Sequence, residues 1–390
     1  MWTLSGRGTA QLCVGPDPWK DPVPPLSKRT IRNAYLLRQD LVTQAGRGVL
    51  SEVEHLVGIQ SQSPTAPFFA LHSRVQNFCP EELSSLVSKK NVVRLCTMRG
   101  TLHSVSAKHA TALRVLTQPA LNREYDRVFA KGLEGLQPEH LRREITALLD
   151  GRALTTKDLV QELHRRWPGY RPTQLMGAAR CLVPLMQLPP RGTWGARGQP
   201  TYGLVHQQIP HRTRPVNLQL PDLIRMYLKA YGPATIQDFQ QWSGLTGTVP
   251  HFAHLSSELR QLVGEDGDFY FDLPRSARPQ QLDLDRIVLL APFDNALLSH
   301  KRRDRIISPA RHAAITTANG IVPGTFLKRG QVAGTWAAVA HADWLEINIQ
   351  SFEPLLDLES EQLRQELLAM STNLYQQPVM KIANRQRTLE

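Results

Sequence analysis

At three places along the chain, a Ser or Thr is followed three residues later by an acidic residue at the start of an amphipathic helix. The pairs are Ser51 with Glu54, Thr155 with Asp158, and Thr235 with Asp238. In such a capping box, the hydroxyl accepts a hydrogen bond from a backbone N–H of the first helical turn, and the acidic side chain returns a bond to the capping residue. Each pair follows an earlier amphipathic stretch, so the chain is predicted to repeat one helical unit three times.

Each predicted unit ends in short strand-like runs. In the first unit, residues 92–98 and 101–105 are joined through Arg99 and Gly100; in the second, 192–195 precede 201–204; in the third, 262–263 precede 269–271. Helices followed by a hairpin are the order of a winged helix, a helix-turn-helix variant. We therefore predict three tandem winged-helix units, over residues 27–106, 107–206 and 216–274.

The parts of the chain outside these units differ in character. Residues 1–26 are rich in Gly and Pro without periodicity, which predicts a disordered N-terminal arm. Short apolar runs at 287–290, 324–327, 332–339 and 344–349 predict a β-rich module over 284–356, either a small β-barrel or a sheet. Residues 357–390 are expected to hold a closing helix and a basic tail. The predicted fold class is α+β.

Two glutamines follow the helix that contains Ser51. Gly58 is expected to end that helix, and Ser63 precedes Pro64, which disfavours helical backbone before it. In extended backbone, side chains two residues apart share one face, whereas on a helix they point roughly 200° apart. Gln60 and Gln62 are therefore predicted to face one cleft.

The charge balance favours a polyanionic partner. Lys and Arg total 46 against 34 acidic residues, a formal charge of +12 with a pI near 9.8. Nucleic acid fits this balance, although many basic proteins bind nothing charged. The densest cluster holds Lys301, Arg302, Arg303 and Arg305, with Lys328 and Arg329 as a possible extension. These side chains are either DNA contacts or an ordinary solvated surface.

Several classes of protein lack support in the sequence. The four cysteines form no C-x-x-C pair, the 13 histidines include no H-E-x-x-H, and no Gly-rich phosphate loop occurs. An activity without metal or cofactor is expected. No apolar run approaches the ~20 residues that a membrane span needs. We expect a cytoplasmic, nucleoid-associated protein.

Five short sequence blocks, in the order in which they occur along the chain, resemble those of a known family. Residues 58–64 (Gly-Ile-Gln-Ser-Gln-Ser-Pro) and 93–103 are followed by 232–235 with 242–244, by Leu-Ala-Pro-Phe-Asp at 290–294, and by 330–336. Over about residues 28–373 the chain resembles the AlkZ/YcaQ-type DNA glycosylases, winged-helix proteins that remove alkylated purines. In that family the Gln-x-Gln pair is catalytic, and a subgroup carries Asp at the second position. The resemblance implies that Gln60 and Gln62 are catalytic; Ser61 stands where the family usually has an apolar residue.

The resemblance also implies a substrate and a mechanism. An amide is a poor general base, but an N-alkylated purine is already positively charged and leaves as a neutral base. Gln62 would position water, and Gln60 would hold it or contact the sugar, in a monofunctional enzyme acting on double-stranded DNA that contains alkylated purines. Bulky adducts or crosslinks from genotoxic natural products, and self-resistance to such toxins, follow from the same resemblance. We expect a monomer, since one chain of this length is large enough to clasp a duplex.

Other interpretations stay open at this point. Arg99 and His103, on the first predicted hairpin, could touch DNA, but His103 could equally be a core residue. Gln-Ser-Gln before Pro is often only a solvated turn. A non-catalytic winged-helix regulator, or a structural nucleoid protein, would also be basic; a regulator would need a recognition helix with exposed polar side chains.

Overall fold

The computed structural model describes residues 24–317, 320–376 and 380–386. The α-helices are α1 (Lys28–Arg38), α2 (Val49–His55), α3 (Ala66–Arg74), α4 (Pro80–Ser88), α5 (Ala107–Leu116), α6 (Gln118–Glu124), α7 (Pro138–Leu148), α8 (Thr156–Arg166), α9 (Pro172–Leu182), α10 (Val205–Gln208), α11 (Leu220–Tyr231), α12 (Ile236–Ser243), α13 (Val249–His254), α14 (Asn295–Leu298), α15 (Pro309–Ile315) and α16 (Asp357–Met370). Shorter 3₁₀ or π segments occur at Met98–Gly100, Tyr125–Phe129, Ala130–Leu133 and Ser371–Tyr375.

The strands fall into three sheets. They are β1 (Ile59–Gln60), β2 (Val92–Cys96), β3 (Leu102–Ser106), β4 (Leu154–Thr155), β5 (Leu185–Leu188), β6 (Thr201–Leu204), β7 (Arg260–Val263), β8 (Phe269–Asp272), β9 (Val288–Leu290), β10 (Gly324–Lys328), β11 (Gln331–Ala340), β12 (Leu345–Ser351) and β13 (Met380–Gln386). The predicted mixture of helices and strands is confirmed. Within the described ranges, no helix combines the length and the apolar character needed to cross a bilayer.

Of the three predicted capping boxes, the one at α12 forms completely, the one at α8 forms only its N-cap half, and the third does not form. Thr155 and Thr235 cap α8 and α12, and in each case the hydroxyl accepts from the N–H of the aspartate three residues on. The box predicted at Ser51 is wrong, because α2 already begins at Val49. There the Glu82 carboxylate of α4 accepts a hydrogen bond from the Val49 N–H at 3.4 Å. A partner from another helix thus replaces the local cap.

The hairpins of the first two predicted units join edge to edge. The strands form one six-stranded sheet in the order β1-β3-β2-β5-β6-β4, and β2 pairs with β5 through Arg94 opposite Gln187. Residues 27–106 and 107–206 therefore share a sheet, whereas the third hairpin, β7–β8, stands alone. The assignment of these units as winged helices stays a prediction.

The β-rich module is an open sheet. Four of its strands, β9 to β12, lie where the apolar runs predict them, and the order is β13-β12-β11-β10-β9. The predicted small barrel is wrong for the described part of the chain, since β9 and β13 stay at opposite edges and closure would require them to pair. The predicted tail is corrected as well: residues 380–386 form β13, which pairs in parallel with the edge that β12 would otherwise leave open. Residues 1–23 of the predicted N-terminal arm lie outside the described residues.

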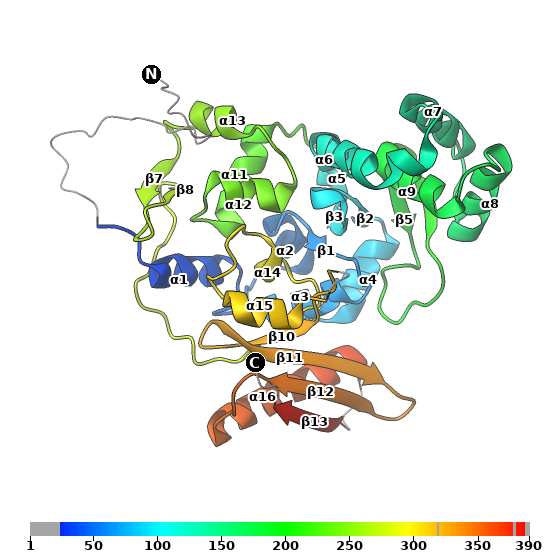
Figure 1. Cartoon of the computed structure of the whole chain (residues 1–390). Helices are drawn as coiled ribbons and strands as arrows, with labels where there is room; N and C mark the ends of the chain where they lie inside the picture. Colours follow the sequence, from blue (N-terminus) through cyan, green and yellow to red (C-terminus); the bar gives the residue numbers. More distant parts are fainter. Residues whose placement is uncertain (1–23, 318–319, 377–379, 387–390) are drawn as a thin grey trace.

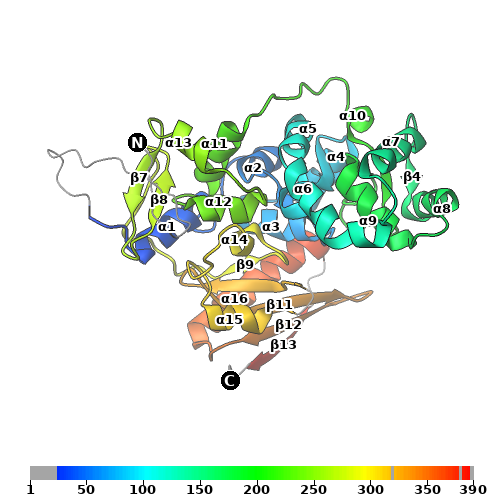
Figure 2. The same cartoon turned by 45° about the horizontal axis from the view of Figure 1, so that its top comes forward.

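Three groups of helices and strands surround the segment that contains α14. Figure 1 shows α11–α13 and α7–α9 on opposite sides of the molecule, with the β9–β13 sheet and α16 below both. The same arrangement appears after rotation in Figure 2, where α14 lies in the middle. The largest apolar cluster crosses these groups, because Tyr35 of α1, Leu95 of β2, Tyr227 of α11 and Leu297 of α14 all belong to it. This cluster joins α1, β2, α11 and α14, whereas α7–α9 have an apolar cluster of their own that includes Leu141, Leu159 and Leu175.

One buried ion pair ties the centre together. Arg74, at the end of α3, and Asp294, just before α14, form two hydrogen bonds of 2.6 and 3.0 Å, and their side chains are 1% and 0% exposed. Asp294 also accepts from the backbone N–H groups of Ala291 and Ala296. The two charges thus neutralise each other in the interior, a condition that a buried ion pair needs to be tolerated, although Nε of Arg74 has no hydrogen-bond partner among the described residues.

We expect removal of one partner to be far more harmful than removal of an exposed pair. Asp294→Ala would leave the Arg74 guanidinium buried without its carboxylate, which should lower the free energy of unfolding by about 3–5 kcal/mol. Arg142→Ala, which breaks the exposed Arg142–Glu139 pair on α7, is the matched control and should leave the denaturation midpoint unchanged. Urea denaturation measures both; equal midpoints for the two variants would contradict the assigned role of the buried pair.

Candidate active site

Strand β1 holds the first glutamine of the motif against the hairpin β2–β3. Gln60 pairs with His103 of β3, and the Ser61 N–H donates to the Leu102 carbonyl at 2.7 Å. The backbone is extended at Ile59 and Gln60, as predicted, but the extended segment expected to reach Ser63 stops there and the chain bends at Gln62. Gln60 is 4% exposed, whereas Gln62 is exposed. The two glutamines therefore differ in their access to solvent.

Gly58 makes the turn from α2 into β1. Its φ is +99°, and a Cβ there would lie 2.6 Å from Cγ1 of Val105 on β3. A side chain at this position would be strained by the backbone angle and would also displace β1 from its partner strand. The predicted helix end at Gly58 thus has a second purpose, since it brings the Gln motif into the sheet.

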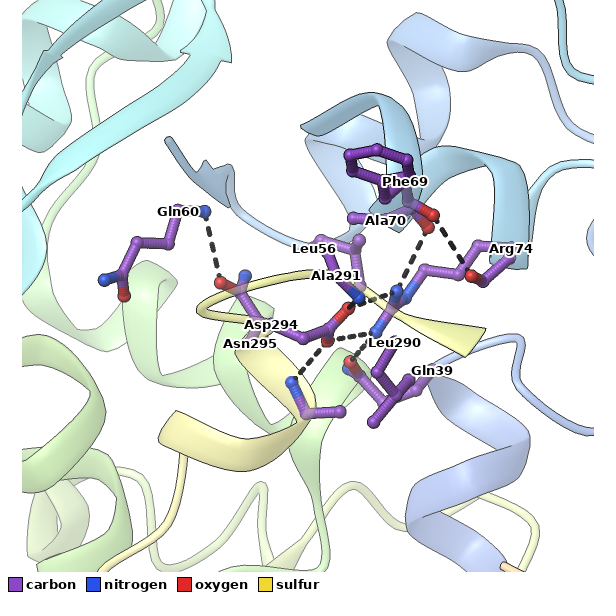
Figure 3. Close-up of polar contacts among 12 residues, drawn as sticks. Gln39, Leu56, Gln60, Phe69, Ala70, Arg74, Leu290, Ala291, Asp294 and Asn295 are labelled. Atoms are coloured by element: carbon purple, nitrogen blue, oxygen red, sulfur yellow. Dashed lines mark hydrogen bonds and ion pairs between the residues drawn. The ribbon is translucent and has the colours of Figure 1, made fainter. Parts of the chain in front are cut away.

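Asn295, the first residue of α14, fixes the backbone of Gln60 (Figure 3). Its side-chain oxygen accepts from the Gln60 N–H at 3.2 Å, and its amide nitrogen donates to the Gly58 carbonyl at 2.8 Å. The same nitrogen donates to the hydroxyl of Tyr231, which in turn donates to the Leu56 carbonyl. A residue 235 positions away thus holds both sides of the turn.

Arg99 holds the side chain of Gln60. Its Nη2 donates to Oε1 of Gln60 at 2.7 Å, and its Nη1 donates to the carbonyl of Trp242, in the last turn of α12, at 2.6 Å. Arg99 has no ion pair with any described carboxylate. Burial and the nearby charge of Arg303 lower the pKa of its guanidinium to about 10, against opposing contributions from Tyr231 and Tyr227. Arg99 therefore keeps its positive charge at neutral pH.

A second arginine holds the peptide group before Gln62. Arg94 of β2 is 2% exposed and donates through Nη2 to the Ser61 carbonyl at 2.8 Å. Its Nε and Nη1 have no hydrogen-bond partner among the described residues. Burial lowers the pKa of Arg94 to about 10, and the charge of Arg191 acts in the same direction. The glutamine motif is thus bordered by guanidinium groups without carboxylate partners in the described chain.

His103 lies inside the protein in this structure. It is 1% exposed, and its Nδ1 is 3.0 Å from the Thr101 carbonyl. Burial lowers the pKa of His103 to about 3, and the charge of Arg99 contributes to the shift. The imidazole is therefore neutral at physiological pH and has no proton to give as a general acid. A direct DNA contact by His103 stays a prediction.

The predicted basic cluster divides into two groups. Three of its cations are bound to carboxylates: Arg302 to Asp266 and Asp268, Arg305 to Asp238, and Lys328 to Glu359. Arg305 is also buried and donates to the Pro233 carbonyl, so it joins the third unit to the segment after α14. Lys301 is exposed without an ion pair in the described chain, Arg303 contacts His312, and the 70% exposed Arg329 is 4.0 Å from Glu359.

A basic cavity of about 800 Å³ lies beside this cluster, and Lys28, Lys301, Arg303 and His312 line it. Neither glutamine is among its lining residues. Its chemistry suits phosphate groups, whereas the Gln motif offers neutral amides. We therefore place the candidate active site at Gln60 and Gln62, and the cavity outside it. In the described residues, no group of three or more His, Cys, Asp or Glu side chains could hold a metal ion.

The comparisons with known proteins agree with the sequence motifs. Residues 53–373 match the family described as AlkZ-like DNA glycosylases, and the chain belongs to this family. A curated relative from Streptomyces sahachiroi, named interstrand DNA cross-link repair glycosylase, is 26% identical over 328 residues, which cover 77% of this chain and 85% of the relative. The solved structure of the Streptomyces sahachiroi DNA glycosylase AlkZ covers 93% of this chain and 100% of its own, with a TM-score of 0.74 at 21% identity. That likeness shows a shared fold.

The sequence reasoning did not find the residues that support the motif. Asn295 directly follows the Leu-Ala-Pro-Phe-Asp block, and Arg94 lies within an apolar strand-like run, but neither position indicates a contact with residues 58–61. Both contacts join segments that are distant in the sequence. The signal available was indirect: polar residues within otherwise apolar blocks are unusual in cores unless they are hydrogen-bonded.

We expect the imidazole of His103 to remain neutral well below the ordinary histidine range, because burial and Arg99 oppose its protonation. Long-range ¹H–¹⁵N NMR spectra that report ring nitrogens, recorded from pH 7.5 to 5.5, should show His103 in one neutral tautomer throughout. The His103→Asn variant identifies its signals. A change toward the imidazolium pattern in this range would contradict the burial described here.

Proposed function

We propose that this protein is a monofunctional DNA glycosylase that hydrolyses the N-glycosidic bond of N-alkylated purines such as 7-alkylguanine and 3-alkyladenine. Gln60 and Gln62 form the catalytic pair. The observation that carries the proposal is the fixation of Gln60 by Asn295 on its backbone and by Arg99 on its side chain, in a chain of the DNA glycosylase family. Such preorganisation of a neutral side chain suits a site that orients groups instead of transferring protons.

The chemistry of the site agrees with a charged leaving group. When the purine is alkylated, the electrons of the breaking bond neutralise the positive ring, so the base departs without a general acid. His103 is neutral, and Asp294 is bound to Arg74, so neither supplies a proton. Water adds to C1′, and its proton passes to solvent. Gln62 positions this water, and Gln60 holds it or contacts the sugar.

Double-stranded DNA is the proposed partner, bound by a single copy of the chain. Lys301, Arg303 and Arg329 are the strongest candidates for phosphate contacts, since ion pairs engage them least. Arg302, Arg305 and Lys328 would have to exchange a carboxylate for a phosphate. Arg99 and His103 belong to the glutamine site itself. Each phosphate contact adds a salt-dependent, sequence-independent increment to affinity.

We extend the proposal to bulky adducts and interstrand crosslinks. The relative from Streptomyces sahachiroi is named for crosslink repair. The exposure of Gln62 fits a substrate that stays in the duplex, because an enclosed pocket for a flipped base would bury it. Protection against a genotoxic natural product, association with the nucleoid and three winged-helix units complete this proposal.

The glycosylase proposal is tested with an oligonucleotide that carries one 7-methylguanine. We expect strand breaks only after alkaline treatment, because a monofunctional enzyme leaves an abasic site with an intact backbone. The Gln60→Ala/Gln62→Ala variant should excise at least about 100-fold more slowly while it still binds DNA. Gln261→Ala, on the exposed side of β7, is the control and should excise at the native rate.

The thermal midpoint of the double variant, which should stay near the native value, shows that its slower excision is not a result of misfolding. If the native protein excises neither 7-methylguanine nor a bulkier N7 adduct but binds a defined DNA sequence, it is a regulator and the proposal is wrong.

A further inference from the structure

Arg99 determines which end of the Gln60 amide can meet a substrate. A guanidinium carries only N–H donors, so the group that faces Arg99 must be the side-chain oxygen of Gln60. The 2.7 Å contact to Oε1 is therefore fixed by chemistry as well as by geometry. The amide is planar, so Nε2 points away from Arg99. Arg99 occupies one of the two lone pairs of this oxygen, and the end of the amide left without a partner is the Nε2 donor.

The Nε2 end of Gln60 is open. It has no hydrogen-bond partner among the described residues, and it is not one of the fully enclosed unpaired atoms there. In Figure 3 the Gln60 side chain points away from the Arg74–Asp294 pair. Gln60 as a whole is 4% exposed, and its side chain is held in place by the Arg99 contact.

Arg99 is itself held firmly on both sides. Its second nitrogen donates to the Trp242 carbonyl, where the last carbonyls of α12 carry partial negative charge. Its backbone adopts a left-handed conformation with φ of 56°, and a Cβ added at Gly244 would lie 3.0 Å from the Arg99 N and Cα atoms. The third unit therefore packs directly against the turn that carries Arg99.

The positive charge around Gln60 favours an anionic acceptor for the N–H of its amide. A cation bonded to the amide oxygen polarises the amide and strengthens its N–H as a donor. Arg94 and Arg303 add further positive charge around the motif, and neither has an ion pair with a described carboxylate. Such a site favours an anion and disfavours the cationic sugar of the transition state. A DNA phosphate next to the damaged nucleotide satisfies both demands, because it accepts the bond and offsets the positive field.

We propose that Arg99 is a positioning residue that makes Gln60 a hydrogen-bond donor to a phosphate flanking the damaged nucleotide, and that Gln62 alone orients the attacking water. The inference rests on the proposed function and refines it: the two glutamines act on different parts of the substrate. Gln60 positions the sugar of the damaged nucleotide by donating a hydrogen bond to its phosphate. Gln62, whose amide is exposed and makes no hydrogen bond to a described residue, keeps its oxygen for water.

The test replaces each phosphate that flanks a 7-methylguanine by a neutral methylphosphonate, one at a time, and measures binding and single-turnover excision. For the native protein, we expect one of the two replacements to weaken binding about tenfold or more, as loss of a hydrogen bond to a charged group does. In Gln60→Glu, nearly the same shape pairs with Arg99 but offers no N–H. Native phosphate DNA should then bind poorly, and the methylphosphonate should no longer cost affinity.

Matched variants separate this role from a structural one. Arg99→Leu frees the Gln60 amide and should abolish the methylphosphonate effect, and Arg99→Lys, which can still donate to Oε1, should restore it in part. Gln62→Ala should keep the full effect on binding and lose excision. A thermal midpoint for Gln60→Glu near the native value shows that its fold is intact.

The outcomes distinguish the inference from the proposed function. If the native protein excises the base but the methylphosphonate effect is absent, or persists unchanged in Gln60→Glu, the phosphate role is wrong and the glycosylase assignment stands. If the effect is present and depends on Gln60 while no base is released, the phosphate role stands and the glycosylase assignment is wrong. Excision by Gln60→Glu at or above the native rate would also overturn the inference, because it would show that the oxygen of residue 60 serves the reaction.

Discussion

The buried pair of Arg74 and Asp294 is the contact on which the geometry of the glutamine motif depends. It fixes the segment before α14 against α3, and the next residue in the chain, Asn295, then meets the backbone of Gln60. Burying two charges is costly unless they are paired and hydrogen-bonded, and here the ion pair is supplemented by bonds to the carbonyl of Ala70 and the N–H groups of Ala291 and Ala296. A motif only two residues long in its strand thus acquires a defined position from residues more than 200 positions away.

In the candidate active site, neutral amide side chains are surrounded by positive charge. Arg99 and Arg94 each hold one end of the Gln60–Gln62 segment, and neither is neutralised by a described carboxylate. A free enzyme of this kind repels the cation that glycosidic cleavage creates. Bound DNA changes the balance, because its phosphates bring negative charge to the same place. In the proposed mechanism, the substrate therefore supplies part of the electrostatic stabilisation of its own transition state.

Local patterns predicted much of the fold and little of the site's support. Thr235 with Asp238 predicts the start of α12, and the apolar runs 287–290 and 324–327 predict β9 and β10. These predictions succeed because helix caps and hydrophobic patterns depend on interactions within a few residues. Ser51 failed as a cap because Glu82, from another helix, replaced it. Which strand edges meet decides the pairing of β2 with β5, the open form of the second sheet and the place of β13, and no local pattern contains this information. Asn295 and Arg99 contact Gln60 from segments that are distant in the sequence. The resemblance and the spacing identify the two glutamines, whereas their hydrogen-bond partners follow only from the three-dimensional structure.

A crystal structure of the protein with duplex DNA that contains a cationic pyrrolidine in place of the damaged nucleotide tests the central claim most directly, because this ring mimics the charged sugar of glycosidic cleavage. We expect the ring beside the glutamine motif, with a water bridging it and the Gln62 oxygen at hydrogen-bond distances of about 3 Å, and a flanking phosphate oxygen at a similar distance from Nε2 of Gln60. A ring bound instead in the cavity lined by Lys301, Arg303 and His312, with both glutamines free of DNA, would contradict the assignment of the active site.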